Sequence, residues 1–320
     1  MRRRSLTLAA LAATAVPLSS RRALAQPANP PRIVVPYAPG GVGDMMSRAL
    51  AERMSPLGGQ TILVDNKPGG GTVIGAQAVH AAPADGQQLL MVAASFVINQ
   101  HLMARLPFDP LRDFVPVSLL ASNPHLLIVH PSVPASDLKS LVAWARGRDA
   151  SYASFGNGSS GHLGFELLKK AADFPMVHVP YKGGAPAIAD LIAGQVHAML
   201  TDLPQAVPHV KAGKVKAIAL AGPRRAAALP DVPTFAEMGL PSFESRSWYG
   251  MVMRSGSPAE SVQRWNQALL AALREPEVRS RLEQAGLDII GTPADEFGGF
   301  LRRESARYAE AVRLSGAKIE

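Results

Sequence analysis

Strand-like and helix-like runs alternate along most of this chain, and this alternation limits the fold more than any other feature. In the first third, the strand-like runs are RIVVPY (32–37), TILVDN (61–66) and QQLLMVAAS (87–95). The segment after the first run repeats apolar residues at Met46, Leu50 and Met54, the spacing of one helix face. A β-α-β-α-β order predicts an α/β fold whose parallel sheet has helices on both faces.

A second series of the same kind begins near HLLIVH (125–130). It continues through the strand-like runs SYASF (151–155), MVHVPYKGG (176–184), QVHAMLTD (195–202) and KVKAIALAG (214–222). The helix predicted between two of these runs ends at Gly194, a typical stop signal.

The pattern changes after Pro241. A strand-like run at 245–253 precedes two long helical stretches, 257–274 and 292–312, with Ser257 and Thr292 as the predicted cap residues. We expect this C-terminal part to return to the first unit. The predicted domains are therefore residues 26–124 plus 246–320, which form a discontinuous α/β domain, and residues 125–245, with a ligand cleft between the two.

The first 25 residues read as a secretory signal peptide. They combine a basic start, an apolar middle and a small-x-small end, with cleavage expected after Ala25. Both general secretion and twin-arginine export fit the sequence. The segment carries five arginines and no acid, so its removal lowers the formal net charge from +8 to +3. No dense basic patch remains in the mature chain, and nucleic-acid binding is not expected.

Glycine-rich loops follow several of the predicted strands, at the sheet edge where α/β proteins bind ligands. The first loop contains Tyr37, Pro39, Gly40, Gly41 and Gly43, and it ends at Asp44. Its glycines allow backbone N–H groups to face a ligand, and the following helix start favours a carboxylate or phosphate. Asp44 is interpreted mainly as the N-cap of its own helix and less as a ligand contact.

Three further loops supply candidate side chains. Ser95 follows the third strand and fits a ligand contact and a helix cap equally well. The loop FGNGSSGHLG (155–164) and the serine before it supply neutral hydrogen-bonding groups and a histidine. In the next loop, a tyrosine and a lysine follow the predicted strand. The candidates from these later segments are Ser154, Asn157, Gly158, Ser159, His162, Tyr181, Lys182 and Asp202. His162 is interpreted mainly as a surface or cap-region residue and Lys182 mainly as a surface residue, and both less as ligand contacts.

Several chemistries are excluded or disfavoured by the same residues. Gly156, Gly158 and Gly161 have dinucleotide-binding spacing, but the next strand ends in VPYK, without the acid that binds the ribose. The chain has no P-loop, no G-x-S-x-G elbow and no compact metal signature. It also has no cysteine. No catalytic residue, cofactor or metal is therefore predicted, and a secreted nucleotide-dependent enzyme is the least favoured function.

Five segments resemble the Bug/TctC family of periplasmic solute-binding proteins from tripartite tricarboxylate transporters. They are VPYAPGGVGD, VDNKPGGGTVIGAQAV, SYASFGNGSSGHLGFELL, VPYKGGAPAIADLIAGQVHAML and LPDVPTFAEMGLP. The resemblance extends from about Arg32 to the C-terminus. It implies a two-domain, type II-like periplasmic-binding-protein fold. It also implies that the loops at Gly40 and Ser154 line the cleft. Gly43 and Gly184 depart from the family pattern, in which hydroxyl residues are common.

The resemblance implies a periplasmic protein that captures a small organic carboxylate for a secondary transporter. Di- or tricarboxylates, aromatic acids and amino acids are all compatible ligands. Membrane permease subunits are the expected partners, and the protein is expected to be a monomer. The alternative function is that of a sensor, which would present its bound carboxylate to a membrane kinase.

Overall fold

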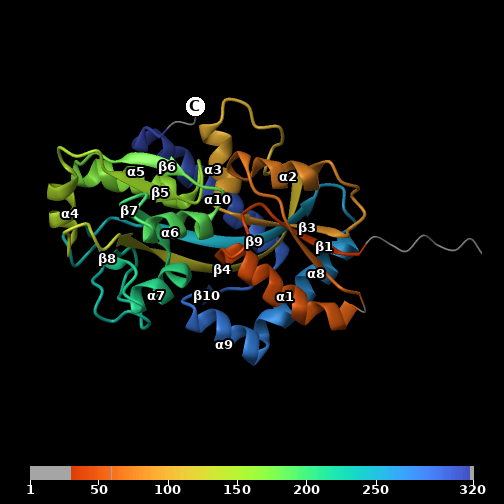
Figure 1. Ribbon diagram of the computed structural model, residues 1–320. Coiled ribbons are helices and arrows are strands. Elements are labelled where there is room, and N and C mark those ends of the chain that lie inside the picture. The colour runs from red at the N-terminus through yellow and green to blue at the C-terminus, as the bar shows by residue number, and fades with distance from the viewer. Residues whose placement is uncertain (1–29, 59, 318–320) are drawn as a thin grey trace, which may run out of the picture.

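The computed structural model describes residues 30–58 and 60–317, so the predicted signal peptide lies outside the described residues. The strands form one mixed sheet in the order β2-β1-β3-β9-β4-β7-β5-β6, and β8 and β10 also pair with β4 (Figure 1). Their bounds are β1 Arg32–Val35, β2 Leu63–Asn66, β3 Gln88–Ala93, β4 Phe114–Val129, β5 Ser151–Ser154, β6 Val177–Pro180, β7 Ala198–Asp202, β8 Lys216–Leu220, β9 Arg246–Arg254 and β10 Asp288–Ile289.

Helices connect nearly all of these strands. They are α1 Val42–Gly58, the short 3₁₀ helix η1 Gly70–Thr72, α2 Val73–His80, α3 Ser95–Leu102, α4 Leu138–Ala145, α5 Ser160–Ala172, α6 Gly184–Ile192, α7 Leu203–Lys211, α8 Ala259–Arg274, α9 Pro276–Gln284 and α10 Ala294–Ser315. Gly194 follows α6 with a φ of 74° and bonds back to Leu191, which confirms the predicted helix stop.

The long strand β4 is shared by two lobes (Figure 1). Its residues 114–124 pair with β9, whereas residues 125–129 pair with β7 and β8. We call residues 30–124 and 246–317 lobe 1, and residues 125–245 lobe 2. The partners of β4 therefore change between residues 124 and 125, and the domain boundary at this place stays a prediction.

The prediction of a parallel sheet is correct only at the two ends of the sheet. The strands β1, β2 and β3 are parallel, and so are β5, β6 and β7. In the centre, β9 is antiparallel to both β3 and β4, and β4 is antiparallel to β7. Residues 125–129 of the predicted run are the last five residues of the 16-residue strand β4. The part of β4 before them contains Pro116 and Pro124, which are unusual within a strand and make it hard to recognise in the sequence.

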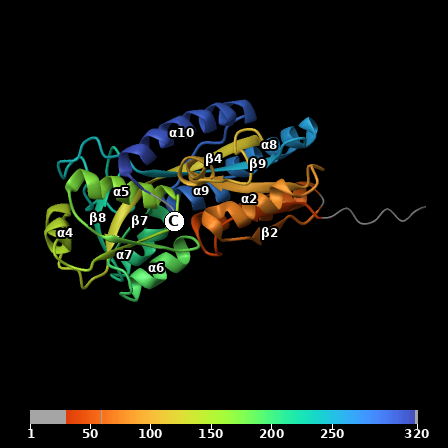
Figure 2. The same cartoon turned by 90° about the horizontal axis from the view of Figure 1, so that it is seen from above.

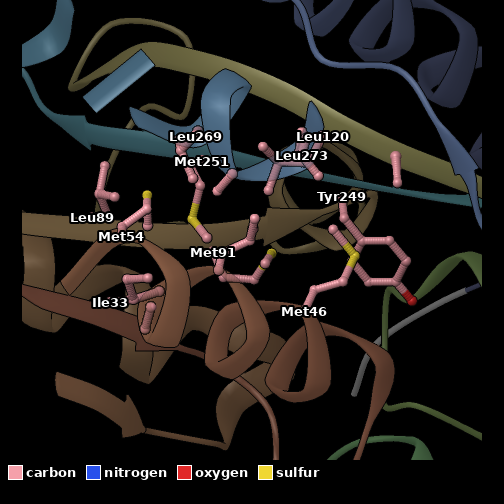
Figure 3. Packing of buried hydrophobic residues seen from close by; sticks show 14 of the residues in the cluster. Ile33, Met46, Met54, Leu89, Met91, Leu120, Tyr249, Met251, Leu269 and Leu273 are labelled. Carbon is pink, nitrogen blue, oxygen red and sulfur yellow. The ribbon is translucent and has the colours of Figure 1, made fainter. Parts of the chain in front are cut away.

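Alternate residues of each strand point to opposite faces of the sheet, and both faces are packed. In lobe 1, Ile33 lies on the face covered by α1 and α8, where it belongs to the same core cluster as Met46 and Leu269 (Figure 3). Its neighbour Val34 faces the opposite core, which includes residues of α3 and α10. Lobe 2 follows the same rule, because Leu127 and Leu126 belong to separate buried clusters.

The C-terminal part returns to lobe 1, as the sequence predicts. Strand β9 pairs with β3, and α10 packs along α3, β4 and α5 (Figure 2). The predicted caps at Ser257 and Thr292 are wrong, because Pro258 and Pro293 occupy the cap positions. The Thr292 hydroxyl instead accepts a hydrogen bond from the N–H of Leu119 and so ties the start of α10 to β4.

Candidate functional site

A cavity between the lobes, which we call the inner cavity, is the candidate site. Five helices begin at its wall: α1 at Gly41–Gly43, α3 at Ser95, α5 at Ser159 and Ser160, α6 at Gly184, and α7 just after Asp202. The cavity is small in this structure, with about 30 Å³ of space open to water-sized molecules.

The helix starts give the inner cavity a positive electrostatic character without basic side chains. The first N–H groups of a helix have no partner within the helix, and the helix dipole places partial positive charge there. In α5, the Ser159 hydroxyl accepts a hydrogen bond from the N–H of His162 at 3.2 Å, so Ser159 is the N-cap. Helix α1 comes from lobe 1 and α5 from lobe 2, so an anion in the cavity is approached from both lobes.

Hydroxyl groups complete the polar wall. The Tyr37 hydroxyl lies 2.8 Å from the Ser95 hydroxyl, and those of Ser160 and Ser247 are 3.0 Å apart. Burial raises the pKa of Tyr37 well above its usual value, and the Ser95 hydrogen bond offsets this only in part. Burial likewise raises the pKa of Tyr249. Both tyrosines therefore stay protonated at neutral pH and are able to donate hydrogen bonds.

Asp202 is a buried carboxylate in the wall of the inner cavity. It accepts hydrogen bonds from the hydroxyl of Tyr249 and, at 3.1 Å, from the side-chain amide of Asn123. Burial acts to raise its pKa, but the contacts with His125, Tyr249 and Ser247 outweigh burial and hold the pKa below its usual value. Asp202 is therefore charged at neutral pH.

Asp44 does not fill the N-cap position that the sequence favours, and it does not line the inner cavity. It lies inside the first turn of α1 and accepts a hydrogen bond from the N–H of Gly40 at 3.0 Å. Its other partners are Arg48, at 2.9 Å, and the side-chain amide of Asn66, also at 2.9 Å. Hydrogen bonds from Arg48, Gly40 and Asn66 lower its pKa despite burial, which acts in the opposite direction. Asp44 therefore fixes the shape of the first glycine loop.

A second space, which we call the outer hollow, adjoins the inner cavity. Tyr37 and Phe155 line both spaces. The outer hollow is lined from lobe 1 by the loop at 69–72 and from lobe 2 by Asn157, Tyr181 and Lys182. The Tyr181 hydroxyl donates to Asp190 within its own lobe at 2.7 Å. The two lobes touch at this hollow, because the N–H of Ala38 donates to the carbonyl of Lys182 at 2.8 Å.

The remaining candidates lie in or beneath the loops and line neither space. Pro39 and Gly40 belong to the first loop, and Gly40 has a φ of 86° that favours glycine. The Ser154 hydroxyl is bonded to His178 at 2.7 Å. His162 stacks on His178 at 4.0 Å, and its Nδ1 accepts from the N–H of Gly158 at 3.3 Å. These groups support the loop that carries Ser159.

Ser160 and Asp202 of the cavity wall both lie near His125, but the three residues do not form a hydrolytic triad. Such a triad needs the carboxylate on one imidazole nitrogen and the serine on the other. Here Ser160 and Asp202 both approach Nε2 of His125, at 3.4 and 3.5 Å, while Nδ1 is bonded to Ser245 at 2.8 Å. Among the described residues, no group of three His, Cys, Asp or Glu side chains is placed to hold a metal ion.

Several wall residues were not predicted from the sequence. They are Val42, Ala93, Ala94, Phe155, Gly184, Gln205, Ser247 and Tyr249. Ser247 and Tyr249 are two residues apart on β9 and therefore share a face of the sheet. That spacing was visible in the sequence, but the position of β9 between β3 and β4 was not.

Two α/β lobes around a cavity lined by helix starts and hydroxyl groups are typical of a solute-binding protein with the periplasmic-binding-protein fold. The chain belongs to the family described as the tripartite tricarboxylate transporter family receptor, whose model matches residues 46–316. It is 35% identical over 314 residues to a protein from the tcbD-tcbE intergenic region of Pseudomonas sp. strain P51, covering 97% of this chain and 94% of the relative. It is 33% identical to the protein BugT of Bordetella pertussis, covering 92% of this chain and 91% of BugT.

Solved structures confirm the predicted two-domain fold. The periplasmic binding protein BugD is 32% identical, with a TM-score of 0.87 over 91% of this chain and 99% of BugD. Rpa4515 of R. palustris, solved with adipate, is 32% identical, with a TM-score of 0.87 over 92% and 99% of the two chains. MatC from Rhodopseudomonas palustris, solved with malate, is 31% identical, with a TM-score of 0.85 over 90% and 100% of the two chains.

Proposed function

We propose that the inner cavity binds a small organic carboxylate, which the protein captures for a tripartite tricarboxylate-type secondary transporter. The observation that carries this proposal is the meeting of five helix starts at one cavity whose lining, among the described residues, contains no lysine or arginine. N–H groups and hydroxyls hold an anion without a strong ion pair, so the ligand is released again when the lobes open. The two relatives solved with adipate and malate support a carboxylate ligand.

The proposed contacts fall into two sets. Tyr37, Gly41, Gly43, Ser95, Ser159 and Asp202 line the inner cavity, together with Ser160, Ser247 and Tyr249. Asn157, Tyr181 and Lys182 line the outer hollow and are proposed to contact the parts of a ligand that extend from the inner cavity. Asp44, Ser154, Gly158 and His162 are proposed to act indirectly, because they shape the loops.

The cell location and the partners are part of the same proposal. A periplasmic location is supported by the signal-peptide pattern at 1–25 and by the periplasmic relative BugD. The described residues include no helix that is both long enough and apolar enough to span a membrane. The protein acts as a monomer that delivers its ligand to membrane permease subunits, and it performs no chemical reaction on the ligand.

Isothermal titration calorimetry with a panel of dicarboxylates, aromatic acids and amino acids tests the proposal. Once a ligand is found, Ser160→Ala and Ser247→Ala are each expected to weaken binding by roughly 3- to 10-fold, the effect of one lost hydrogen bond. Ser280→Ala is the matched control, because Ser280 is exposed on α9 and does not line the inner cavity. If no acid in the panel binds, or if all three variants bind like the parent, the cavity is not the carboxylate site.

A further inference from the structure

We propose that Asp202 makes the inner cavity selective for acids that carry an ammonium or hydroxyl group next to the bound carboxylate. The inference rests on the proposed function, since it concerns the class of acid that the same cavity takes. Its observation is separate, however: a charged carboxylate lies in the wall of a cavity that is otherwise built to attract anions.

The charges around the inner cavity are unbalanced. Asp202 lines it, and no lysine or arginine does so among the described residues. The basic side chain nearest to Asp202 is His125, which does not line the cavity and whose Nε2 lies 3.5 Å from Oδ1 of Asp202. The permanently charged side chains have other positions. Arg48 pairs with Asp44 at 2.9 Å, and Lys182 lines the outer hollow. A ligand carboxylate therefore shares the cavity with an acid whose charge no basic wall residue neutralises.

Asp202 also retains capacity to accept hydrogen bonds. A carboxylate offers about four acceptor positions. Tyr249 occupies one on Oδ2 and Asn123 occupies one on Oδ1. Nε2 of His125 lies 3.5 Å from Oδ1, and Ser247 is close enough to help lower the Asp202 pKa. Because Asp202 lines the inner cavity, the unused acceptor capacity is within reach of a ligand that brings its own donor.

The orientation of Asp202 is fixed by both lobes. Asp202 ends β7 in lobe 2, whereas Tyr249 on β9 and Asn123 on β4 belong to lobe 1. The carboxylate is thus held in one place when the lobes are together. The helix starts would bind the carboxylate of a ligand, and the fixed Asp202 carboxylate would accept a hydrogen bond from a donor group next to that carboxylate.

A hydroxyl group and an ammonium group on the ligand differ in their effect on the negative charge of Asp202. A hydroxyl group donates one hydrogen bond to Asp202 but leaves the repulsion between the two carboxylates. An ammonium group donates and also neutralises the charge, so an amino acid gains more from Asp202 than a hydroxy acid does. An unsubstituted acid experiences the repulsion alone, and it is expected to bind most weakly.

Two matched ligand series test this order in the unmodified protein. The first series is succinate, malate and aspartate, which differ only in the substituent at C2. The second is 3-phenylpropionate, 3-phenyllactate and phenylalanine. In the series that fits the cavity, the amino and hydroxy acids are expected to bind at least about tenfold more tightly than the unsubstituted acid. Equal affinities across both series would overturn the inference but leave carboxylate binding intact. If no member of either series bound, the proposed function would fail together with the inference.

The variant Asp202→Asn separates selectivity from structural damage. Removal of the negative charge is expected to tighten binding of the unsubstituted acid and to weaken binding of the amino acid by about tenfold or more. A merely structural role of Asp202 predicts weaker binding of every ligand, so opposite shifts are the diagnostic result. Asp231→Asn, at an exposed position in lobe 2, changes the net charge by the same amount. It is expected to change neither the affinity for the unsubstituted acid nor that for the amino acid. If Asp202→Asn weakens all ligands alike while its melting temperature stays near that of the parent, the inference is wrong.

Discussion

The substitution Gly161→Ala tests whether the close approach of α5 to β7 positions the wall of the inner cavity. Gly161 lies in the first turn of α5, beside the wall residues Ser159 and Ser160. A Cβ atom at this position would lie 2.7 Å from the carbonyl oxygen of Leu200 on β7. The obstacle is backbone in a central strand, so the helix start has to move away by a few tenths of an ångström.

The expected magnitude follows from two opposing terms. Forcing an extra carbon into a packed site costs about 1–3 kcal/mol. Alanine in place of glycine favours a helix by up to about 1 kcal/mol, and less near the first turn. Because steric conflict exceeds the propensity gain, we expect the free energy of unfolding to fall by about 1–2 kcal/mol. The amides of α5 move with the helix start, so the affinity for the ligand falls as well.

Urea unfolding measures the stability change, and titration calorimetry measures the affinity. Gly299→Ala is the matched control, because Gly299 lies inside α10 and its Cβ would meet only the flexible end of Arg303, at 3.3 Å. The control is expected to gain up to about 1 kcal/mol from helix propensity and to bind normally. If Gly161→Ala is as stable as the control and binds as tightly, the argument that close helix–strand packing sets the site is refuted.

Three further predictions concern single side chains. Tyr37→Phe removes the hydroxyl that meets Ser95 at 2.8 Å, and we expect calorimetry to report roughly 3- to 10-fold weaker ligand binding; an unchanged affinity would exclude this hydroxyl from the site. Asp44 has a folded-state pKa below its unfolded value of 3.8, so the stability that it contributes is complete above that value and is lost as the pH falls through the folded pKa. The stability gap between the parent and Asp44→Asn, measured by urea unfolding, should therefore narrow in acid, and a gap that is independent of pH would contradict this cause. Burial lowers the pKa of His162 from 6.5 to about 4, so its neutral form favours folding above pH 6.5, and this contribution is lost as the pH falls toward 4. His162→Gln should flatten the fall in melting temperature across that window, whereas an unchanged slope would assign the acid sensitivity to other groups.

Local patterns in the sequence identified most of the elements around the site. The apolar run at 32–37 and the four-residue spacing of Met46, Leu50 and Met54 predict β1 and α1 because strand and helix geometry repeats along the chain itself. The glycine loops were recognised for the same reason, and both α1 and α5 begin at the inner cavity as expected. The signal-peptide prediction lies outside the described residues, and the family resemblance is confirmed by the match over residues 46–316.

The errors arose where a side chain has competing partners that are distant in the sequence. Asp44 looked like an N-cap, but Asn66, 22 residues away, and Arg48 hold it inside the first turn. The cap and contact interpretations of Ser95 were equally supported by the sequence, and the structure places its hydroxyl in the cavity wall against Tyr37, which is 58 residues away. His162 looked like a surface residue, yet it stacks on His178 beneath the loop. No local spacing encodes such pairs.

The sequence by itself determined the alternation of strands and helices, the two units and the positions of the glycine loops, because backbone geometry and short-range sterics govern each of these. Only the tertiary structure decided which side chains face the inner cavity. Tyr249 meets Asp202 because β9, from the end of the chain, inserts between β3 and β4. Strand pairing of this kind depends on contacts between residues far apart in the chain, and so the site is a property of the folded sheet.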